Sequence, residues 1–328
     1  MRKTILLISC VCGLFVSIRS SAQSDLDNLL KGSQADANYL AQGYLEPVLN
    51  AVGSGLAQGW YNTAAPHKKW GFDLTINVSS IQFPSSELAY HVDNTKLTTL
   101  NIISPANGMA PTVIGADVSP VYNYKATPTG TFNGPPGVNI QDIPLGGLPL
   151  PMVNLGLGIP WNTELKFRYG SYSGSGGTKF SLFGVGVVHD IKQHIPGIKL
   201  APFDLSAFVG YTTMSSEVGF DSANPSQIGK ADFSATTIQG LIGKKFSVLT
   251  VYGGIGYNFS SGSFKVLGSF PDSTTGATLV DPVSLSSSIS GPRATAGLRL
   301  KLAIFTLHGD YTFQRYNTLT VGFGFSVR

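Results

Sequence analysis

The end of the chain alternates strictly between apolar and small or polar residues. Leu319, Val321, Phe323, Phe325 and Val327 occupy every second position of residues 318–328, and threonine, glycine and serine fill most of the positions between them. A period of two residues is that of a β-strand, whose successive side chains point to opposite faces. A tilted strand needs about 9–11 residues to cross a membrane, so pattern and length are both typical of a transmembrane strand.

The same alternation recurs upstream. Residues 294–304 and 306–314 precede the last segment with short connections, which predicts an antiparallel meander. Their charged residues lie on the face of small residues, whereas a lysine or arginine facing the middle of a bilayer would cost about 2–4 kcal/mol. Further alternating segments are residues 70–79, 164–170, 205–212 and 249–259.

We therefore predict an all-β fold, an antiparallel up-and-down transmembrane β-barrel over residues 70–328. At about 18 residues for a strand and its connection, this length accommodates about 14 strands, with 12–16 as the accepted range. Residues 84–160 are rich in proline and glycine, and we expect a long insertion there because proline cannot donate to a sheet ladder. A soluble β-sandwich would show the same alternation and is the alternative fold.

Composition restricts the class of protein further. Glycine accounts for 39 of the 328 residues and charged residues for only 12%, which disfavours a coiled coil or an ordinary soluble enzyme. The hydrophobic content of 42% is too high for a disordered chain. No clean run of 18 apolar residues follows residue 22, so a membrane would have to be crossed by strands.

Residues 1–22 have the features of a secretory signal peptide: Arg2 and Lys3, a largely apolar run, and small residues before a cleavage point. An N-terminal membrane anchor, or a lipoprotein signal at Cys10, are the alternatives. Cleavage would leave nearly balanced charge and no cysteine, so we expect neither disulfides nor nucleic-acid binding. The predicted location is the cell outer membrane.

Residues 25–56 carry a helical pattern. Ser33 followed by Asp36 resembles a capping box, and we expect the helix to be interrupted or kinked at Pro47 and to end in the glycines that follow. Because the apolar face of such a helix must be buried, we predict that residues 23–69 form a helical hatch in the barrel lumen; the periplasmic rim is the alternative. The predicted apolar face consists of Leu40, Tyr44, Val48, Val52 and Leu56.

Several charged residues share the faces of the predicted strands that would point into the lumen. They are Glu164, Lys166, Arg168, Arg299, Lys301, His308 and Asp310. If they converge, they form a basic constriction that would hold a carboxylate headgroup. The alternative is a scattered set of luminal ion pairs that keeps the interior polar.

Enzyme chemistry is not indicated. The sequence lacks Gly-x-Ser-x-Gly, and no histidine is followed two residues later by serine, as barrel phospholipases have it. His189 and His194 are five residues apart, a spacing that would put them on different faces of a helix or strand. Pro196 and Gly197 just after them predict a turn, so we expect a solvated connection rather than a metal site. Glycines such as Gly184 and Gly186, on an inner face, leave room for a plug or bend a strand. We expect no catalytic residues, no metal and no cofactor.

Two blocks of sequence resemble a family. Residues 44–47, 59–64 and 71–74 with His67 form the first block, and residues 189–193 and 202–205 with Pro196-Gly197 form the second. They resemble an uncharacterised family of outer-membrane β-barrel proteins of double-membraned bacteria. More distantly, a helical N-terminal segment ahead of a barrel is similar to the long-chain fatty-acid transporter family, which implies a hatch and hydrophobic substrates. The Asn-Pro-Ala motif of those transporters is absent, and the chain ends on Arg328 rather than an aromatic residue.

These patterns favour passive transport of small hydrophobic molecules through a barrel gated by its hatch. The alternative is a non-transporting barrel with a structural, anchoring or surface-interaction role. The expected partners are outer-membrane lipid, a small hydrophobic ligand and the barrel-assembly machinery.

Overall fold

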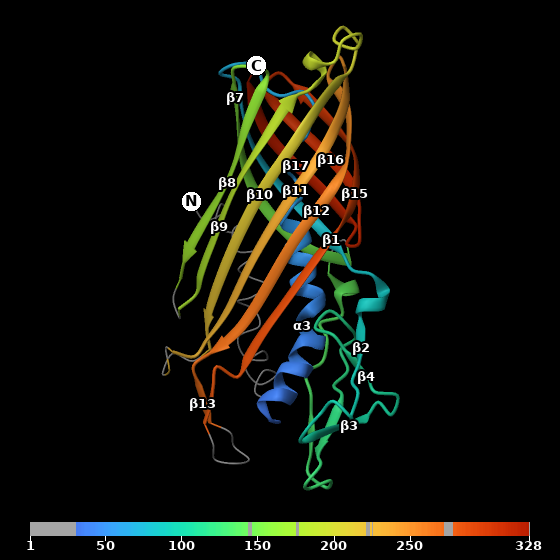
Figure 1. Ribbon diagram of the computed structural model, residues 1–328, viewed down its shortest axis with the longest axis vertical. Coiled ribbons are helices and arrows are strands. Elements are labelled where there is room, and N and C mark those ends of the chain that lie inside the picture. The colour runs from blue at the N-terminus through green and yellow to red at the C-terminus, as the bar shows by residue number, and fades with distance from the viewer. Residues whose placement is uncertain are drawn as a thin grey trace.

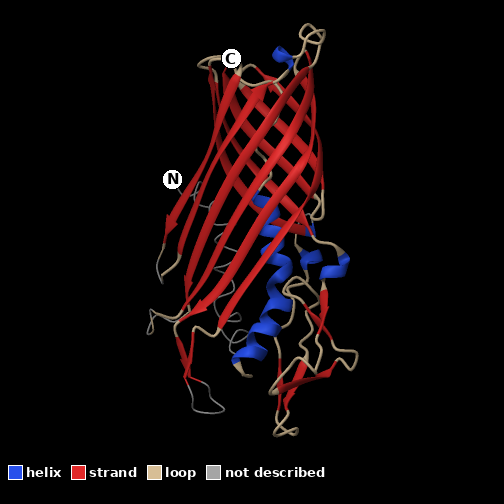
Figure 2. Ribbon diagram, viewed as in Figure 1, coloured by secondary structure: helices blue, strands red, loops and turns tan. Residues whose placement is uncertain are grey.

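The computed structural model of the chain describes residues 31–143, 146–174, 177–220, 224, 226–271 and 278–327. The predicted signal peptide and residues 23–30 lie outside the described residues. Ten strands of the described part close into an antiparallel barrel, in the order β1-β17-β16-β15-β12-β11-β10-β9-β8-β7 (Figures 1 and 2). Their bounds are β1 Phe72–Gln82, β7 Gly147–Ile159, β8 Thr163–Ser173, β9 Lys179–Asp190, β10 Asp204–Gly219, β11 Ile228–Phe246, β12 Leu249–Leu267, β15 Val283–Leu302, β16 Phe305–Phe313 and β17 Thr318–Val327.

The barrel wall is apolar outside and polar inside. Along β17, Val321, Phe323 and Phe325 are exposed on the outer surface, whereas the alternate residues Thr320, Gly322, Gly324 and Ser326 are buried. β1 repeats this pattern. A soluble β-sandwich would bury its apolar face, so this inverted arrangement is that of a barrel surrounded by lipid. The predicted antiparallel up-and-down transmembrane barrel is confirmed as a fold.

The two ends of the barrel differ in their connections. At the end that holds the start of β1 and the end of β17, called here the turn end, most connections are short, such as residues 160–162, 247–248 and 303–304. At the opposite end, called the loop end, residues 83–146 and 268–282 form the long connections (Figure 1). The indole rings of Trp70 and Trp161 are exposed at the turn end.

The barrel has ten strands in the described part of the chain, so the predicted number of about 14, with 12–16 accepted, is wrong. That prediction rested on strands of about ten residues. β11 and β12 each have 19 residues and β15 has 20. Residues 83–146 contribute no strand to the barrel. The insertion is also shorter than predicted, since β7 is a barrel strand. Its Pro149 and Pro151 lie where β7 pairs with β1 on one side but not with β8 on the other, so their missing N–H donors cost little.

One helix, α3 (Gln34–Leu56), precedes the barrel in the described part of the chain. The hydroxyl of Ser33 accepts a hydrogen bond from the backbone N–H of Asp36 at 3.1 Å, so the predicted cap is confirmed. The predicted interruption at Pro47 is wrong, because the helix is continuous to Leu56. As predicted, the helix ends among glycines, at Leu56 between Gly55 and Gly59. Gly55 also allows close packing, because a Cβ at this position would clash with Cδ1 of Ile81 on the wall. None of the described helices is long and apolar enough to cross a membrane.

The described residues of the range 83–143 form a separate layer at the loop end, called here the head. It packs beside α3 in two small sheets, β2-β4 and β3-β5-β6 (Figure 1). Its elements are η1 Ser85–Glu87, β2 Ala89–His91, β3 Leu100–Ser104, β4 Met109–Pro111, β5 Val121–Tyr124, β6 Thr131–Asn133 and η2 Ile140–Asp142. The remaining elements are β13 Ser269–Pro271 and β14 Thr278–Val280 in one long loop, and η4 Lys192–His194 at the turn end.

The largest hydrophobic core joins α3, the inner wall of the loop-end half and the head. From the predicted apolar face of the helix, Leu40, Tyr44, Val52 and Leu56 are buried in this core and Val48 packs against it. The wall contributes Leu150, Met152, Leu182, Met214 and Phe233, and the head contributes Leu97, Leu100 and Ile102.

Candidate functional site

The candidate site is the barrel interior together with the N-terminal segment, residues 34–71, which runs through it. α3 contacts β15, β12, β11, β1 and β7, and residues 57–71 continue from its end to the start of β1 at the turn end (Figure 1). Four groups of contacts hold this segment, and they follow one another along the chain.

The first group joins a polar face of α3 to the edge of β15. β15 pairs with β16 only from Ala294 onwards, so the edge of its first half has no strand beside it. Asn38 donates to the carbonyl of Pro282 at 2.9 Å and accepts from the N–H of Ser284 at 2.9 Å, as a neighbouring strand would. An unpaired strand edge needs such cover. Five helix residues, spaced by four, contact this edge or its flank: Gln34, Asn38, Gln42, Glu46 and Asn50.

The second group is a pair of buried arginines at the end of α3. Arg168 of β8 is fully buried; its guanidinium donates to the carbonyls of Leu56, at 2.8 Å, and Gln58. Arg293 of β15 donates to the carbonyl of Ala57 at 3.0 Å and to Oε1 of Gln58 at 2.7 Å. The last carbonyls of a helix have no partner in the helix and form the negative end of its dipole. The two guanidinium groups therefore act as a clamp on this end.

The third group is an aromatic cluster just beyond the clamp. The guanidinium carbon of Arg168 lies 3.6 Å from the centre of a ring of Trp60. Trp60 and Tyr61 pack with Phe208 and Tyr252 from the wall, and Trp60 rests on three glycines of β9 and β10. A Cβ on Gly210 would lie 2.9 Å from the Trp60 ring. The three glycines are Gly184, Gly186 and Gly210.

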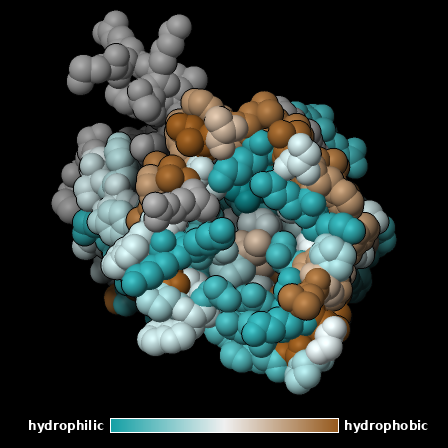
Figure 3. Space-filling view, turned by 90° about the horizontal axis from the view of Figure 1, so that it is seen from above, coloured by the Kyte–Doolittle hydropathy of each residue, from teal (hydrophilic) through white to brown (hydrophobic). Residues whose placement is uncertain are grey.

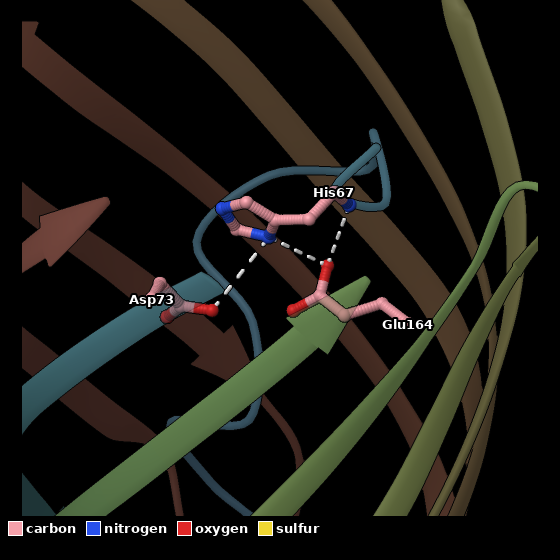
Figure 4. Close-up of side chains that lie close together, drawn as sticks. All are labelled: His67, Asp73 and Glu164. Atoms are coloured by element: carbon pink, nitrogen blue, oxygen red, sulfur yellow. Dashed lines mark hydrogen bonds and ion pairs between the residues drawn. The ribbon is translucent and has the colours of Figure 1, made fainter. Parts of the chain in front are cut away.

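The fourth group is an ionic network around His67, near the turn end (Figure 4). Nδ1 of His67 lies 2.9 Å from a carboxylate oxygen of Glu164 and 3.7 Å from Asp73, and its Nε2 lies 3.0 Å from the hydroxyl of Ser326. His67, Asp73 and Glu164 each offer one atom within 4.8 Å of the others, as metal ligands do. However, Nζ of Lys166 lies 2.5 Å from Glu164 and 3.5 Å from Asp73, so an ammonium group already lies beside both carboxylates and balances one of their two negative charges.

The predicted luminal residues do face inward, but they do not meet in one constriction. Glu164 and Lys166 form an ion pair in the His67 network, whereas Arg168 lies in the clamp. Arg299 and His308 face each other on β15 and β16. Lys301 donates at 3.0 Å to the hydroxyl of Ser326, which also contacts His67, so Lys301 borders the His67 network. Asp310 lies apart and accepts from the hydroxyl of Tyr252 at 2.9 Å.

Three charged residues of the site were missed from the sequence. Arg293 lies next to the segment recognised by alternation, and Asp73 was noted only as a position on a strand face. His67 was noted only within a resemblance, and nothing in its neighbourhood marks it. The four-residue spacing of Gln34, Asn38 and the polar residues after them was a usable signal, because it is a second stripe on a helix already predicted.

The two histidines at the turn end lie together, contrary to the expectation from their spacing. The Nε2 atoms of His189 and His194 are 3.0 Å apart and their rings stack. They meet because β9 ends at Asp190 and η4 folds the chain back.

The crevice between the N-terminal segment and the wall is narrow. It is lined by Gly59, Trp60 and Tyr61 on one side and by Asp73, Asn154 and His308 on the other, and it has no room for a water molecule. In the described part of the chain, the segment therefore packs closely against the wall at this level.

A protein-family model matches residues 1–327, nearly the whole chain. The chain belongs to DUF6588, a family of unknown function. No curated protein matches its sequence.

The chain is similar to several solved structures. One is the translocator domain of the autotransporter NalP from Neisseria meningitidis, at 12% identity over 90% of this chain and 98% of that one, with a TM-score of 0.33. Another is Ail, the attachment invasion locus protein of Yersinia pestis, at 10% identity over 79% and 99%, with a TM-score of 0.28. A third is a loop L8 deletion mutant of OmpT, an outer membrane protein of Vibrio cholerae, at 12% identity over 80% and 99%, with a TM-score of 0.25.

Proposed function

We propose that this protein is an outer-membrane barrel that its own N-terminal segment keeps closed, and that it anchors the head at the cell surface as an interaction module. Short connections in such barrels face the periplasm and long ones face outward, which puts the turn end inside and the head outside. The exposed rings of Trp70 and Trp161 suit the membrane interface at the periplasmic side.

The observation that carries this proposal is the closure of the lumen. The helix, the arginine clamp, the aromatic cluster and the His67 network occupy successive levels of the barrel. A barrel of eight strands has an interior that side chains can fill, whereas open aqueous channels belong to barrels of 16–18 strands. A barrel of ten strands with a helix inside is closer in size to the filled barrels of eight strands than to the open channels of 16–18.

The attachment of the head supports the anchoring role. Asp36 at the start of α3 accepts five hydrogen bonds from backbone and hydroxyl groups of Thr98, Thr99 and Leu100, at 2.6–3.1 Å. Burial alone would raise the pKa of Asp36, but these hydrogen bonds outweigh it and hold the pKa below its ordinary value. Glu87 of the head also binds Arg315 and Tyr316 of the loop between β16 and β17. The head is thus fixed to both the helix and the barrel.

Conductance in planar bilayers tests the closure. We expect the full mature chain to give no ion-conducting steps and a chain lacking residues 23–58 to give them. Frequent steps from the full chain would overturn the closed barrel. For the head, we expect limited proteolysis of outer-membrane vesicles to leave residues 83–146 intact while α3 is present; rapid cleavage there would contradict a rigid module.

A second candidate is the uptake of small hydrophobic molecules, with the N-terminal segment as a movable hatch. One observation favours it: β7 and β8 pair only from Asn154 opposite Arg168 to Ile159 opposite Thr163, and their loop-end halves have no mutual pairing. Behind this seam lie the buried apolar side chains of Leu150 and Met152. The distant resemblance to fatty-acid transporters points the same way and stays a prediction.

Uptake of a fluorescent hydrophobic dye into proteoliposomes separates the two candidates. If the barrel only anchors the head, the full chain adds nothing to passive dye entry. Dye uptake by the full chain that is lost in Met152→Lys, with the barrel still folded, would replace the first proposal by the second.

A further inference from the structure

We propose that the inner faces of β15 and β16 at the turn end form a binding site for a small oxyanion, a phosphate or a carboxylate. The residues come as two facing pairs. Arg299 lies opposite His308, and Lys301 lies opposite Thr306, on consecutive inward positions of the two strands. The site is independent of whether the barrel anchors or transports.

The strongest support is that this part of the wall has buried donors without partners. Arg299 is only 7% exposed, yet its Nε and Nη2 have no hydrogen-bond partner among the described residues. Within the same described part of the chain, Thr306 Oγ1 and His308 Nδ1 are also buried without partners. Buried polar groups are normally paired, because each unpaired one costs free energy. A planar guanidinium fork with two free donors on one edge matches two oxygens of a carboxylate or phosphate.

The contrast with the other two luminal arginines shows what Arg299 lacks. Arg168 and Arg293 both donate to carbonyls at the end of α3, so their guanidinium groups are occupied by the N-terminal segment. No hydrogen bond or ion pair of this kind reaches Arg299 from the described residues. Among these three arginines, and within the part of the chain that the structure describes, Arg293 has a single buried donor without a partner, Nε, whereas Arg299 has two on the same edge, Nε and Nη2.

The local charge also favours an anion. The nearest carboxylates, Asp73 and Glu164, are paired with Lys166 at 3.5 and 2.5 Å and with His67. Nζ of Lys301 donates only to a neutral hydroxyl, that of Ser326, among the described residues. Three cations, Lys166, Arg299 and Lys301, thus face two carboxylates, Asp73 and Glu164, which leaves one positive charge in this group. A basic group in a site of restricted solvent access attracts anions more strongly than one in open water.

The site lies near the turn end of the barrel. Lys301 is half-buried and lies next to the last residue of β15, at the rim. Figure 3 looks down on this end and shows a hollow in its centre, surrounded mainly by hydrophilic residues. An oxyanion in the periplasmic space, or the headgroup of a lipid in the inner leaflet, would approach from this side.

Calorimetric titration of the full mature chain in a neutral detergent tests the proposal, with inorganic phosphate as one probe and dihexanoyl phosphatidic acid as the other. Chloride at matched ionic strength is the blank. We expect binding of phosphate, reduced about tenfold to a hundredfold in Arg299→Gln through loss of charge-assisted hydrogen bonds. Arg299→Lys keeps the charge but not the fork and should bind with intermediate affinity. Lys265→Gln, at an exposed lysine of β12, should bind as the wild type does.

The two probes distinguish the source of the ligand. Binding of both assigns a site for free oxyanions, and binding of the lipid alone assigns a headgroup site; either supports the proposal when Arg299→Gln weakens it. Absence of binding of both probes overturns it, as does equal affinity in the wild type and Arg299→Gln. Circular dichroism and heat-modifiable electrophoretic mobility check that each variant has a folded barrel.

Discussion

Replacing Arg168 by methionine tests the clamp that holds the N-terminal segment in the lumen. Methionine keeps a long side chain but removes every donor. The carbonyls of Leu56 and Gln58 then lose a charged partner in a closed lumen, and Trp60 loses the cation over its ring. When the segment moves out, water replaces these contacts, so the change weakens the closed state relative to the open one.

The size of the effect follows from three contributions. Two hydrogen bonds to a charged group stabilise by about 1.5–3 kcal/mol each. A desolvated cation over an indole ring adds about 2 kcal/mol. Against these, the buried guanidinium carries a desolvation penalty of several kcal/mol that methionine does not have. We expect a net loss of about 3 kcal/mol from the closed state, which raises the open population about a hundredfold.

Single-channel recording in planar bilayers measures this population as the fraction of time in conducting states. We expect rare openings of the wild type and about a hundredfold more open time for Arg168→Met. The matched control is Lys265→Met, which removes an exposed lysine of β12. Unchanged open time in a folded Arg168→Met barrel would refute the idea that the clamp holds the segment.

Three further predictions concern the same segment. Gly210→Val places methyl groups against the ring of Trp60, and we expect a loss of about 1–3 kcal/mol in the free energy of unfolding, measured by urea titration. Because the pKa of Asp36 is lowered in the folded state, its contribution to stability is present above about pH 4 and lost as the pH falls further; Asp36→Asn should remove this acid-dependent loss. An impermeant maleimide on intact cells should label Lys31→Cys, at the loop end, and not Lys199→Cys, at the turn end; the reverse would invert the proposed orientation.

The sequence was sufficient to find many strands of the barrel wall, because lipid outside and polar groups inside impose a two-residue period over about ten residues at a time. It also revealed the cap at Ser33 and the apolar face of α3, which depend on neighbours one to four residues away. The inward direction of the predicted charged residues follows from the same period.

What could not be predicted depends on contacts between distant segments. The number of strands depends on how far β11, β12 and β15 continue beyond the membrane, and alternation does not end where the bilayer does. His67 is 97 residues from Glu164, and it joins the network only because the segment from α3 reaches the turn end. The clamp is similar: carbonyl groups carry no signal in a sequence, so Arg168 could be placed in the lumen but not on Gln58.

The hydrogen bonds between α3 and the edge of β15 change how a deletion of the N-terminal segment must be interpreted. Without the helix, the first half of β15 would present free N–H and C=O groups along an edge, and such edges recruit other strands or aggregate. A chain lacking residues 23–58 thus loses both the plug and the partner of this edge, and its conductance combines two effects. Arg168→Met spares Asn38 and its contacts with Pro282 and Ser284, so it releases the plug while the wall stays intact. If the deletion conducts and Arg168→Met does not, the openings come from a damaged wall, and the N-terminal segment is a structural part of the barrel rather than a gate.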